Sequence, residues 1–493
     1  MLLSKLVENI IDTSIPDFIV KGITNDSRRV KPGYIFVLLN DKNKKYINDA
    51  HHNGAKAIIS SLKENIKNNI FISSPYDIYH KLASKYYAKQ PKNIVGVTGT
   101  NGKTSVSNIC RDLVESAGLP CARIGTLGLY PSIFKYNAFN TTPNASDLHR
   151  TLDILSNINI EHVAMEVSRH GVDSKRAHSV RFTVAAFTHL IPDHPDAYGT
   201  MDSHFRSKKK LFTDLLTSDG VLVLNADVPE YEKLCNAAKG RLVISYGRKA
   251  EDIILVSQKL NKKGQEIEYI VNGVLHTTLL PLYGVYQAHN ALCAIAIMKA
   301  FGINNFKMGA IKQVPGRMQT IDNHLGIHIF VDYGVSPETL EQNLKSIRYH
   351  FCGIKNPGLE TSLKNSEVKS RYSFSGKIIL VLSQKGKVYT GKIPSMGKIA
   401  NDLADHVIVC DGDPRTEDPA IMRKQILASV PHGIEIGNRK EAILYGVNLA
   451  NPGDVVLIAG KGHEYSQFYG GRALNISDAE ALKEILKSKL SSL

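Results

Sequence analysis

Three features of membrane and secreted proteins are missing from this 493-residue sequence. No stretch approaches the roughly 20 apolar residues that a membrane-spanning helix needs. The N-terminus lacks a basic start, a sustained apolar run and a small-residue cleavage site, so it is not typical of a secretory signal. The six cysteines lie far apart without a CxxC pair, and no histidine stands at metal-ligand spacing from them. We therefore expect reduced thiols, a cytoplasmic location and no membrane partner.

The length and the charge set further bounds. A chain this long exceeds what one hydrophobic core usually serves, so two or three domains are expected. The formal net charge is +15. Such an excess fits anionic partners such as nucleotides or nucleic acid, but an Asn/Lys-rich genome produces it too. The lysines are scattered rather than clustered, which favours the genomic explanation, and we expect no nucleic-acid partner.

The most specific local motif lies at residues 96–104, between a strand of β-branched residues and a helix. Glycines let backbone N–H groups close around phosphate oxygens, and the helix N-terminus adds a favourable dipole. The spacing is G-x-x-G-x-x-G-K-T, with Val97 where the strict motif has its first glycine. We predict a binding loop for the phosphates of ATP, made of Gly99, Thr100, Asn101, Gly102, Lys103 and Thr104. Alone, the loop does not distinguish an ATPase, a kinase and a ligase.

The arrangement of apolar segments predicts an α/β protein of three domains. Residues 1–91 combine short β-rich segments with helical patterns and close at a polar stretch that contains proline. Residues 92–314 alternate apolar strands with amphipathic helices, which indicates a central P-loop domain with a mostly parallel sheet. Residues 315–493 repeat that alternation and predict a Rossmann-like C-terminal domain. Within them, residues 349–377 have little apolar periodicity and are predicted to be a surface insertion.

Charged residues follow two strands of the predicted central sheet. Glu166 ends one apolar strand and would project toward the phosphates, where a carboxylate suits Mg²⁺. The next strand leads into Asp193 and His194, and then into a helix that bears Lys208. Singly, each signal is weak, because strand-end acids are common and lysine-rich helices usually face solvent.

Taken in order, the motifs resemble the Mur ligases, cytoplasmic enzymes of peptidoglycan synthesis. The resemblance rests on GTNGKT, TTP (141–143), MEVSRHG, DH, the helical lysine, PGRM (315–318), VDY (331–333), ADHVIV and AGKGHE (459–464). The N-terminal NDSRRVKPGYIFV is similar to the family's uridine-binding segment. The resemblance is greatest to the members that add the third amino acid. It implies that ATP and Mg²⁺ are used to join a diamino acid, meso-diaminopimelate or L-lysine, to UDP-MurNAc-L-Ala-D-Glu through an acyl phosphate. We expect a monomer.

The resemblance also implies roles for single residues. Lys103 and two Mg²⁺ ions would stabilise the charge on the transferring phosphoryl oxygens, with Thr104 and Glu166 holding one ion. His194 and a carbamylated Lys208 would help to hold the other. The remaining positions that match ATP contacts are Asn290, Arg317 and Asp332. Those that match contacts to the nucleotide sugar and its peptide are Ser27, Arg28, Thr141, Thr142, Ser168 and Arg176. Those that match contacts to the incoming amino acid are Asp413, Arg415, Gly460 and Glu464.

The sequence departs from the family pattern at several loops. Gly334-Val335 stand where the family has Ala-His, Gln287 replaces an asparagine, and Val388 stands where an arginine would pair with the amino acid's carboxylate. The first domain has KKYIND in place of DGHxF. Arg415 favours meso-diaminopimelate over L-lysine, because a second carboxylate needs a cationic partner, although Val388 weakens that preference.

Two alternatives to the standard reaction stay open. One is a similar ligase recruited to another carboxylate acceptor, and the other is a catalytically silent homologue that serves as a binding protein. The second alternative is weakened by four retained residues, Lys103, Glu166, His194 and Lys208. A protein without catalytic activity has no physical need for all four.

Overall fold

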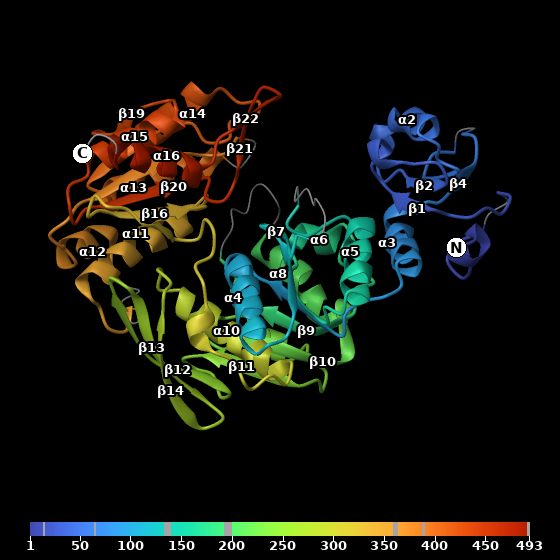
Figure 1. The fold of residues 1–493 in the computed structure, drawn as a ribbon, viewed down its shortest axis with the longest axis horizontal. Coiled ribbons are helices and arrows are strands. Elements are labelled where there is room, and N and C mark those ends of the chain that lie inside the picture. The colour runs from blue at the N-terminus through green and yellow to red at the C-terminus, as the bar shows by residue number, and fades with distance from the viewer. Residues whose placement is uncertain are drawn as a thin grey trace. The chain divides into compact units, whose positions relative to one another are not determined.

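The computed structural model describes residues 1–12, 15–63, 66–132, 140–191, 200–357, 363–386 and 390–490. The chain divides into two compact units. The first comprises Met1–Ile191, Asp202–Ile244 and Ile295–Phe306, and the second comprises Pro192–Met201, Ser245–Ala294 and Lys307–Leu493. The predicted α/β class is confirmed in both units (Figure 1). The domain boundaries after residues 91 and 314 stay predictions.

The first unit begins with a small parallel sheet of order β1-β2-β3-β4. Its strands are β1 (Gly22–Thr24), β2 (Tyr34–Val37), β3 (Ala57–Ser60) and β4 (Asn69–Phe71). Successive side chains of a strand point to opposite faces. Ile35 and Val37 therefore pack with α1 (Leu3–Val7) and α3 (Pro75–Tyr86), whereas Phe36 packs with α2 (Tyr46–His52). Both faces are thus covered by helices.

The larger sheet of the first unit runs in the order β7-β6-β8-β5-β9-β10. Its strands are β5 (Asn93–Thr98), β6 (Cys121–Gly125), β7 (Gly128–Tyr130), β8 (His162–Glu166), β9 (Phe182–Phe187) and β10 (Leu216–Asn225). All are parallel except β7, which forms a hairpin with β6. The helices are α4 (Lys103–Ser116), α5 (Ala145–Asn157), α6 (Arg169–Asp173), α8 (Met201–Lys210) and α9 (Tyr231–Cys235). The predicted alternation of strands and helices is confirmed, and it brings the ends of β5, β8 and β9 to one edge.

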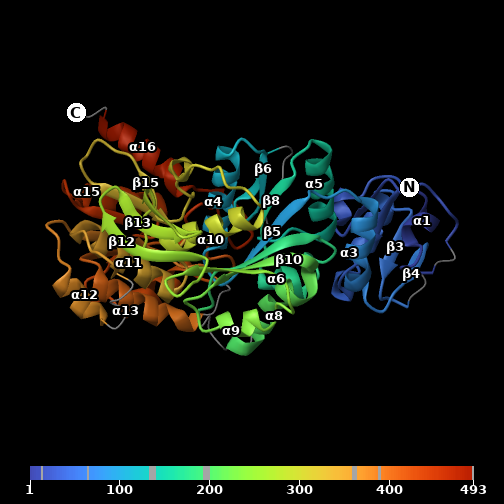
Figure 2. The same cartoon turned by 90° about the horizontal axis from the view of Figure 1, so that it is seen from below.

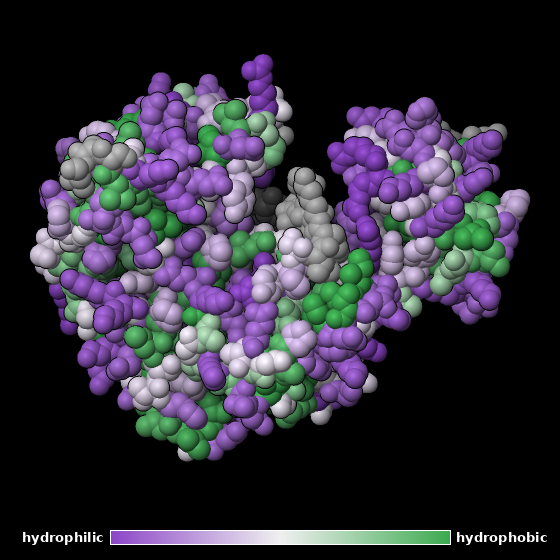
Figure 3. Space-filling view, in the orientation of Figure 1, coloured by the Kyte–Doolittle hydropathy of each residue, from purple (hydrophilic) through white to green (hydrophobic). Residues whose placement is uncertain are grey.

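The described residues of the second unit form three groups of strands. The end of β11 (Val243–Gly247) pairs with an antiparallel meander of β12 (Ile253–Asn261), β13 (Gly264–Val271) and β14 (Val274–Leu280), and α10 (Gln287–Ala300) follows. Apolar side chains gather on the surface over this meander (Figure 3). Among them, Val274 and Leu275 of β14 are more than half exposed.

The second group is a six-stranded sheet of order β15-β16-β20-β17-β18-β19, parallel except for β15. Its strands are β15 (Gln319–Ile321), β16 (His328–Asp332), β17 (Ile378–Leu382), β18 (His406–Val409), β19 (Ile434–Glu435) and β20 (Val455–Ala459). Its helices are α11 (Pro337–Cys352), α12 (Asn365–Arg371), α13 (Ile393–Leu403), α14 (Pro419–Leu427), α15 (Arg439–Leu449) and α16 (Asp478–Leu490). The residues of α11 to α14 pack on one face and those of α15 and α16 on the other (Figure 2). A hairpin of β21 (Ser466–Tyr469) and β22 (Arg472–Asn475) follows β20.

The described part of residues 349–377 differs from the predicted surface insertion. Helix α11 continues to Cys352, and α12 places Val368 in the main core of the second unit. Tyr372 is buried with it, and its ring meets Tyr349 edge to face. A few well-placed apolar side chains are enough to anchor a polar segment, because each buries most of its surface. Across the described residues, no helix has the length and apolar character needed to span a membrane.

Candidate active site

The glycine-rich loop joins β5 to α4 at the carboxyl edge of the first unit's larger sheet. Gly99 and Gly102 have φ of 144° and 88°, a region that residues with a side chain rarely adopt. A Cβ on Gly99 would lie 1.9 Å from Oγ1 of Thr188 at the end of β9. The loop is held there, since Thr100 donates from its N–H to the carbonyl of His189 at 2.8 Å. The sequence pattern thus gives the close backbone turn that a phosphate loop requires.

Two lysine side chains converge on this loop. Lys103 donates from Nζ to the carbonyl oxygens of Gly99 at 3.0 Å and Thr100 at 2.9 Å. Lys208 of α8 donates to the same Gly99 carbonyl at 3.1 Å and is buried. Lys208, which the family resemblance assigns to the site, is thus turned inward, although lysine-rich helices usually face solvent. The pair places two cationic groups beside a loop suited to anions.

Glu166, at the end of β8, is the centre of a hydroxyl cluster. It is fully buried, and it accepts a hydrogen bond from Oγ1 of Thr104 at 3.0 Å. Thr126, in the turn between β6 and β7, donates to both carboxylate oxygens, from its N–H at 2.9 Å and from Oγ1 at 2.9 Å. Oγ1 of Thr141 lies within hydrogen-bond distance of Oγ1 of Thr126, at 3.2 Å. Thr104 and Glu166, which were assigned to one Mg²⁺ ion, thus lie together, and their role as its ligands stays a prediction. Thr126 was not predicted.

The donor atoms of this cluster fit Mg²⁺. Thr104, Thr126 and Glu166 present hydroxyl and carboxylate oxygens, and Mg²⁺ binds few protein oxygens while keeping the rest of its shell for phosphate and water. Within the described ranges, no group of three or more His, Cys, Asp or Glu residues could hold a metal by itself. His194, predicted to hold a second ion with Lys208, lies outside the described residues.

Four of the residues assigned to the nucleotide sugar gather beside Glu166. Thr142 donates from Oγ1 to the carbonyl of Glu166 at 3.1 Å, and it accepts from the N–H of Ser168 at 3.0 Å. Arg176 donates from Nη1 to the carbonyl of Thr142 at 2.9 Å. With Thr141, whose hydroxyl is hydrogen-bonded to that of Thr126, these residues form a polar group next to the cluster.

Ser27 and Arg28 lie on a separate 3₁₀ turn in the small sheet. Ser27 is buried, whereas the Arg28 side chain is 84% exposed and forms an ion pair with Asp26 at 2.8 Å. The neighbouring Arg29, which was not assigned, pairs with Asp147 of α5 at 2.7 Å. This turn is therefore anchored to the larger sheet's helices while it leaves Arg28 open to a ligand.

Three residues assigned to ATP belong to the second unit. Asp332 ends β16, and its carboxylate accepts from the N–H groups of Met318 and Gly334, each at 2.7 Å. Burial raises the pKa of Asp332. Arg317 stacks over the ring of Tyr333, with the guanidinium carbon 4.9 Å from the ring centre. Asp332 thus organises the loop around Arg317, and its contact with ATP stays a prediction.

Asn290 is the third of these residues. It donates from Nδ2 to Oε1 of Gln287 at 2.9 Å, one turn earlier on α10. Both side chains are buried. Gln287, where the sequence departs from the family pattern, therefore holds the Asn290 side chain in place.

The residues assigned to the incoming amino acid gather at the carboxyl edge of the second unit's six-stranded sheet. Arg415 has φ of 59° and lies 3.3 Å from the carboxylate of Asp413. Glu464 forms an ion pair with Lys385. Gly460 follows β20 with φ of 103°, where a Cβ would lie 2.3 Å from the carbonyl of Ser383. All four predicted residues are thus on loops of one sheet edge, where ligands of open α/β sheets bind.

Two lysines at this edge were not predicted. Lys385 follows β17, and Lys461 lies between Gly460 and Glu464, where it donates from Nζ to the carbonyl of Glu464. Desolvation lowers the pKa of Lys461 to about 8. The motif AGKGHE contains Lys461, so its position was visible in the sequence, whereas Lys385 stands in the loop that departs from the family pattern at Val388.

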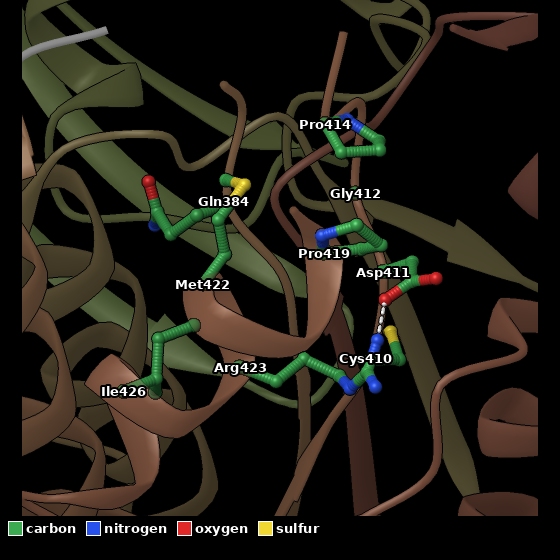
Figure 4. A pocket seen from close by; sticks show the side chains of 9 residues that line it. All are labelled: Gln384, Cys410, Asp411, Gly412, Pro414, Pro419, Met422, Arg423 and Ile426. Atoms are coloured by element: carbon green, nitrogen blue, oxygen red, sulfur yellow. Dashed lines mark hydrogen bonds and ion pairs between the residues drawn. The ribbon is translucent and has the colours of Figure 1, made fainter. Parts of the chain in front are cut away.

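A small cavity is lined by Pro414, which stands between Asp413 and Arg415 in the chain, and by residues of α14 (Figure 4). It encloses about 10 Å³, which is room for about one water molecule. Arg423 of α14 forms an ion pair with Asp411 at its wall. Burial raises the pKa of Cys410, also in the wall, to about 11. The cavity is therefore too small to receive an amino acid.

Comparison with known proteins identifies the family. Residues 97–298 match the Mur ligase middle domain, and residues 361–462 match the Mur ligase glutamate ligase domain. A curated relative from Anaplasma marginale, a UDP-N-acetylmuramoyl-L-alanyl-D-glutamate--2,6-diaminopimelate ligase, is 36% identical over 97% of this chain and 98% of its own. The chain belongs to the Mur ligase family.

Other Mur ligases give the same result. A relative with that same name from Zymomonas mobilis is 34% identical over 95% of each chain. A solved structure with that name aligns over 99% of each chain with a TM-score of 0.65 and 25% identity. The MurF ligase of Thermotoga maritima in complex with ADP aligns over 96% of this chain and 98% of its own, with a TM-score of 0.66 and 19% identity, and it supports the fold alone. The resemblance read from the motifs is confirmed over nearly the whole chain.

Replacing Glu166 with glutamine tests the oxygen cluster of this Mur ligase. The change removes one negative charge but keeps the side chain's shape, so the Mg²⁺ concentration for half-maximal ADP formation is expected to rise about tenfold or more. A titration of activity against Mg²⁺ measures the shift. Glu232→Gln, at an exposed position of α9, is the matched control and should leave the titration unchanged. Equal curves for the two variants would remove Glu166 from the metal site.

Proposed function

We propose that this Mur ligase joins 2,6-diaminopimelate to a carboxylate of UDP-MurNAc-L-Ala-D-Glu at the expense of ATP. One observation carries the proposal: the glycine-rich loop, two inward-facing lysines and the buried Thr104–Glu166 pair are intact in a chain that matches relatives of that name end to end. The identity of both substrates comes from the names of those relatives. We place the reaction in the cytoplasm and expect a monomer.

The proposed reaction has two steps, and residues of the first unit stabilise the negative charge of the first step. The acceptor's carboxylate oxygen attacks the γ-phosphorus of ATP, which gives an acyl phosphate and releases ADP. The amine of the amino acid then attacks the acyl carbon, forms the amide and releases inorganic phosphate. Negative charge spreads over the phosphoryl oxygens during the first step, and the ammonium of Lys103 and the N–H groups of the loop are placed to stabilise it. Mg²⁺, when held by Thr104 and Glu166, supplies further positive charge.

The family pattern predicts a second metal site that contains Lys208 and His194. Of these two residues, only Lys208 lies in the part of the chain that the structure describes. Its burial beside Gly99 supports a role near the phosphates, because a buried amine without a function costs desolvation energy. We propose that carbamylation converts it to an anionic oxygen ligand, with His194 as the other ligand.

A reaction with defined substrates tests the proposal. Purified protein is incubated with ATP, Mg²⁺, UDP-MurNAc-L-Ala-D-Glu and one amino acid at a time, while ADP and the product mass are followed. ADP and the expected tripeptide mass should form with meso-diaminopimelate. No ADP with any amino acid would overturn the proposal. ADP formed only when a different carboxylate acceptor replaces the nucleotide sugar would show recruitment to another pathway.

A further inference from the structure

An open cleft of about 570 Å³ lies at the amino edge of the second unit's six-stranded sheet. Its walls come from the end of α11, the segment between α12 and β17, the loop before β20 and the turn between β12 and β13. The residues assigned to the amino acid follow the carboxyl ends of the strands, so the cleft lies at the opposite edge of the sheet. Its volume falls in the range of about 300–1,000 Å³ that is typical of small-molecule sites.

Aromatic side chains form the apolar part of the cleft. The rings of Phe351 and Phe374 have their centres 5.0 Å apart and are tilted by 33°. Tyr372, between α12 and β17, is 6% exposed, and its phenol oxygen has no hydrogen-bond partner among the described residues. A planar apolar group packs well against such rings, and an acceptor atom brought to this wall would relieve the cost of the unpaired hydroxyl.

The charged side chains that line the cleft are both cations. The ammonium of Lys262 lies 5.8 Å from the centre of the Phe351 ring, and the guanidinium carbon of Arg371 lies 5.5 Å from the centre of the Tyr372 ring. The described lining includes no Asp or Glu. Ser375, in the exposed part of the wall, adds a hydroxyl. The cleft therefore has the charge to attract an anion.

Backbone contacts hold the walls of the cleft together. Leu260, at the end of β12, donates from its N–H to the carbonyl of Ile354, just after α11, at 2.9 Å. Gly376 approaches the loop before β20 so closely that a Cβ on it would lie 2.2 Å from the carbonyl oxygen of Gly453. The cleft is thus formed by the fold itself, as small-molecule sites usually are.

We propose that this cleft is a second binding site, for a small anion that carries an aromatic ring. The ring packs against Phe351 and Phe374, and the anionic group faces the cations Lys262 and Arg371. The site shares no residue with the proposed ligase chemistry. The inference therefore goes beyond the proposed function and does not depend on it.

Cys352 provides a local reporter of binding. It lines the cleft, and its Sγ donates to the carbonyl of Ser373 at 3.6 Å. The rate at which iodoacetamide modifies Cys352 in the full-length protein is followed by mass spectrometry of the labelled peptide. Burial raises the pKa of the Cys352 thiol, so the labelling is done at about pH 9. Cys235 of α9, which is also half-buried, serves as the internal reference.

Phenyl phosphate is the probe, because it joins an aromatic ring to an anion. At saturation it should slow the modification of Cys352 about tenfold or more, since the covered thiol reacts only in the free protein. The modification of Cys235 should not change. Inorganic phosphate lacks the ring and benzyl alcohol lacks the charge, so each should slow Cys352 by less than about twofold at the same concentration.

Two variants test the charge of the cleft. Lys262→Met removes a cation, and Ser375→Glu adds a carboxylate at an exposed position. Each should raise the phenyl phosphate concentration for half-maximal protection about fivefold or more. Lys398→Met removes an exposed lysine of α13 and is the matched control, with no change expected. Each variant is compared with itself without the probe, and thermal melts verify its fold.

Saturation-transfer NMR of the probe's ring protons gives a measurement that does not depend on thiol reactivity. Transfer from the wild-type protein should be strong and should fall in Ser375→Glu. The proposal is overturned if phenyl phosphate leaves Cys352 unprotected and shows no transfer that Ser375→Glu reduces. It is also overturned if Cys352 and Cys235 are protected alike, or if inorganic phosphate protects Cys352 as well as the probe does. These readouts need no ligase activity, so their failure and that of the proposed function are distinguishable.

Discussion

Replacing Lys103 with methionine is expected to lower kcat for ADP formation about a thousandfold while leaving the fold intact. Lys103 is the first residue of α4, and its ammonium lies over the carbonyls of Gly99 and Thr100. Methionine keeps the aliphatic stem but removes the charge that would face the transferring phosphoryl group. The loop's N–H groups remain, so ATP affinity should fall less than kcat. A coupled assay of ADP release at saturating ATP, with a thermal melt, measures both.

Lys210→Met is the matched control for this experiment. Lys210 lies on α8 two residues after Lys208, but its side chain is exposed. Its removal changes the net charge by the same amount and should leave kcat within about twofold of wild type, since an exposed charge is screened by water and salt. A Lys103→Met enzyme that kept more than a tenth of wild-type activity would contradict the phosphate role of Lys103.

The parts of the site that the sequence predicted share one physical origin. A run of β-branched residues that ends in glycines or in an acid is a buried strand with a functional end, and parallel strands bring their carboxyl ends to one edge. Glu166 meets Thr104 because β8 pairs with β5 in a register that sets Glu166 beside Val97. Thr126 could not be predicted in the same way. Thr126 reaches Glu166 only because β6 lies next to β8 in the sheet, and no local sequence pattern predicts which strands are neighbours.

The parts that were missed depend on partners far away in the chain. Lys385 forms an ion pair with Glu464, which lies 79 positions later in the chain. In a lysine-rich sequence, nothing local distinguishes Lys385 from the other lysines. The burial of Val368 was missed because Val368 is an isolated apolar residue in a polar segment. A search for apolar periodicity over a window does not detect such a residue. His194 and Val388 lie outside the described residues, so their assignments stay predictions.

Replacing Arg439 with methionine is expected to destabilise the protein by about 3–5 kcal/mol. Arg439 begins α15 and has no exposed side-chain surface. It donates to both carboxylate oxygens of Asp478, at 2.6 and 2.8 Å, and to Oγ of Ser383 at 2.7 Å. Burial opposes its charge, but Asp478 and Cys410 outweigh burial and raise its pKa. Methionine would leave the Asp478 carboxylate buried without its cation, and urea unfolding measures the loss.

The adjacent residue supplies the control for this prediction. Lys440 pairs with Glu484, but both side chains are more than half exposed, so Lys440→Met should change the free energy of unfolding by less than about 1 kcal/mol. Replacing both members of the buried pair, Arg439→Met with Asp478→Leu, should recover part of the loss, because it removes the unpaired charge. A loss below about 1 kcal/mol for Arg439→Met alone would show that water reaches Asp478.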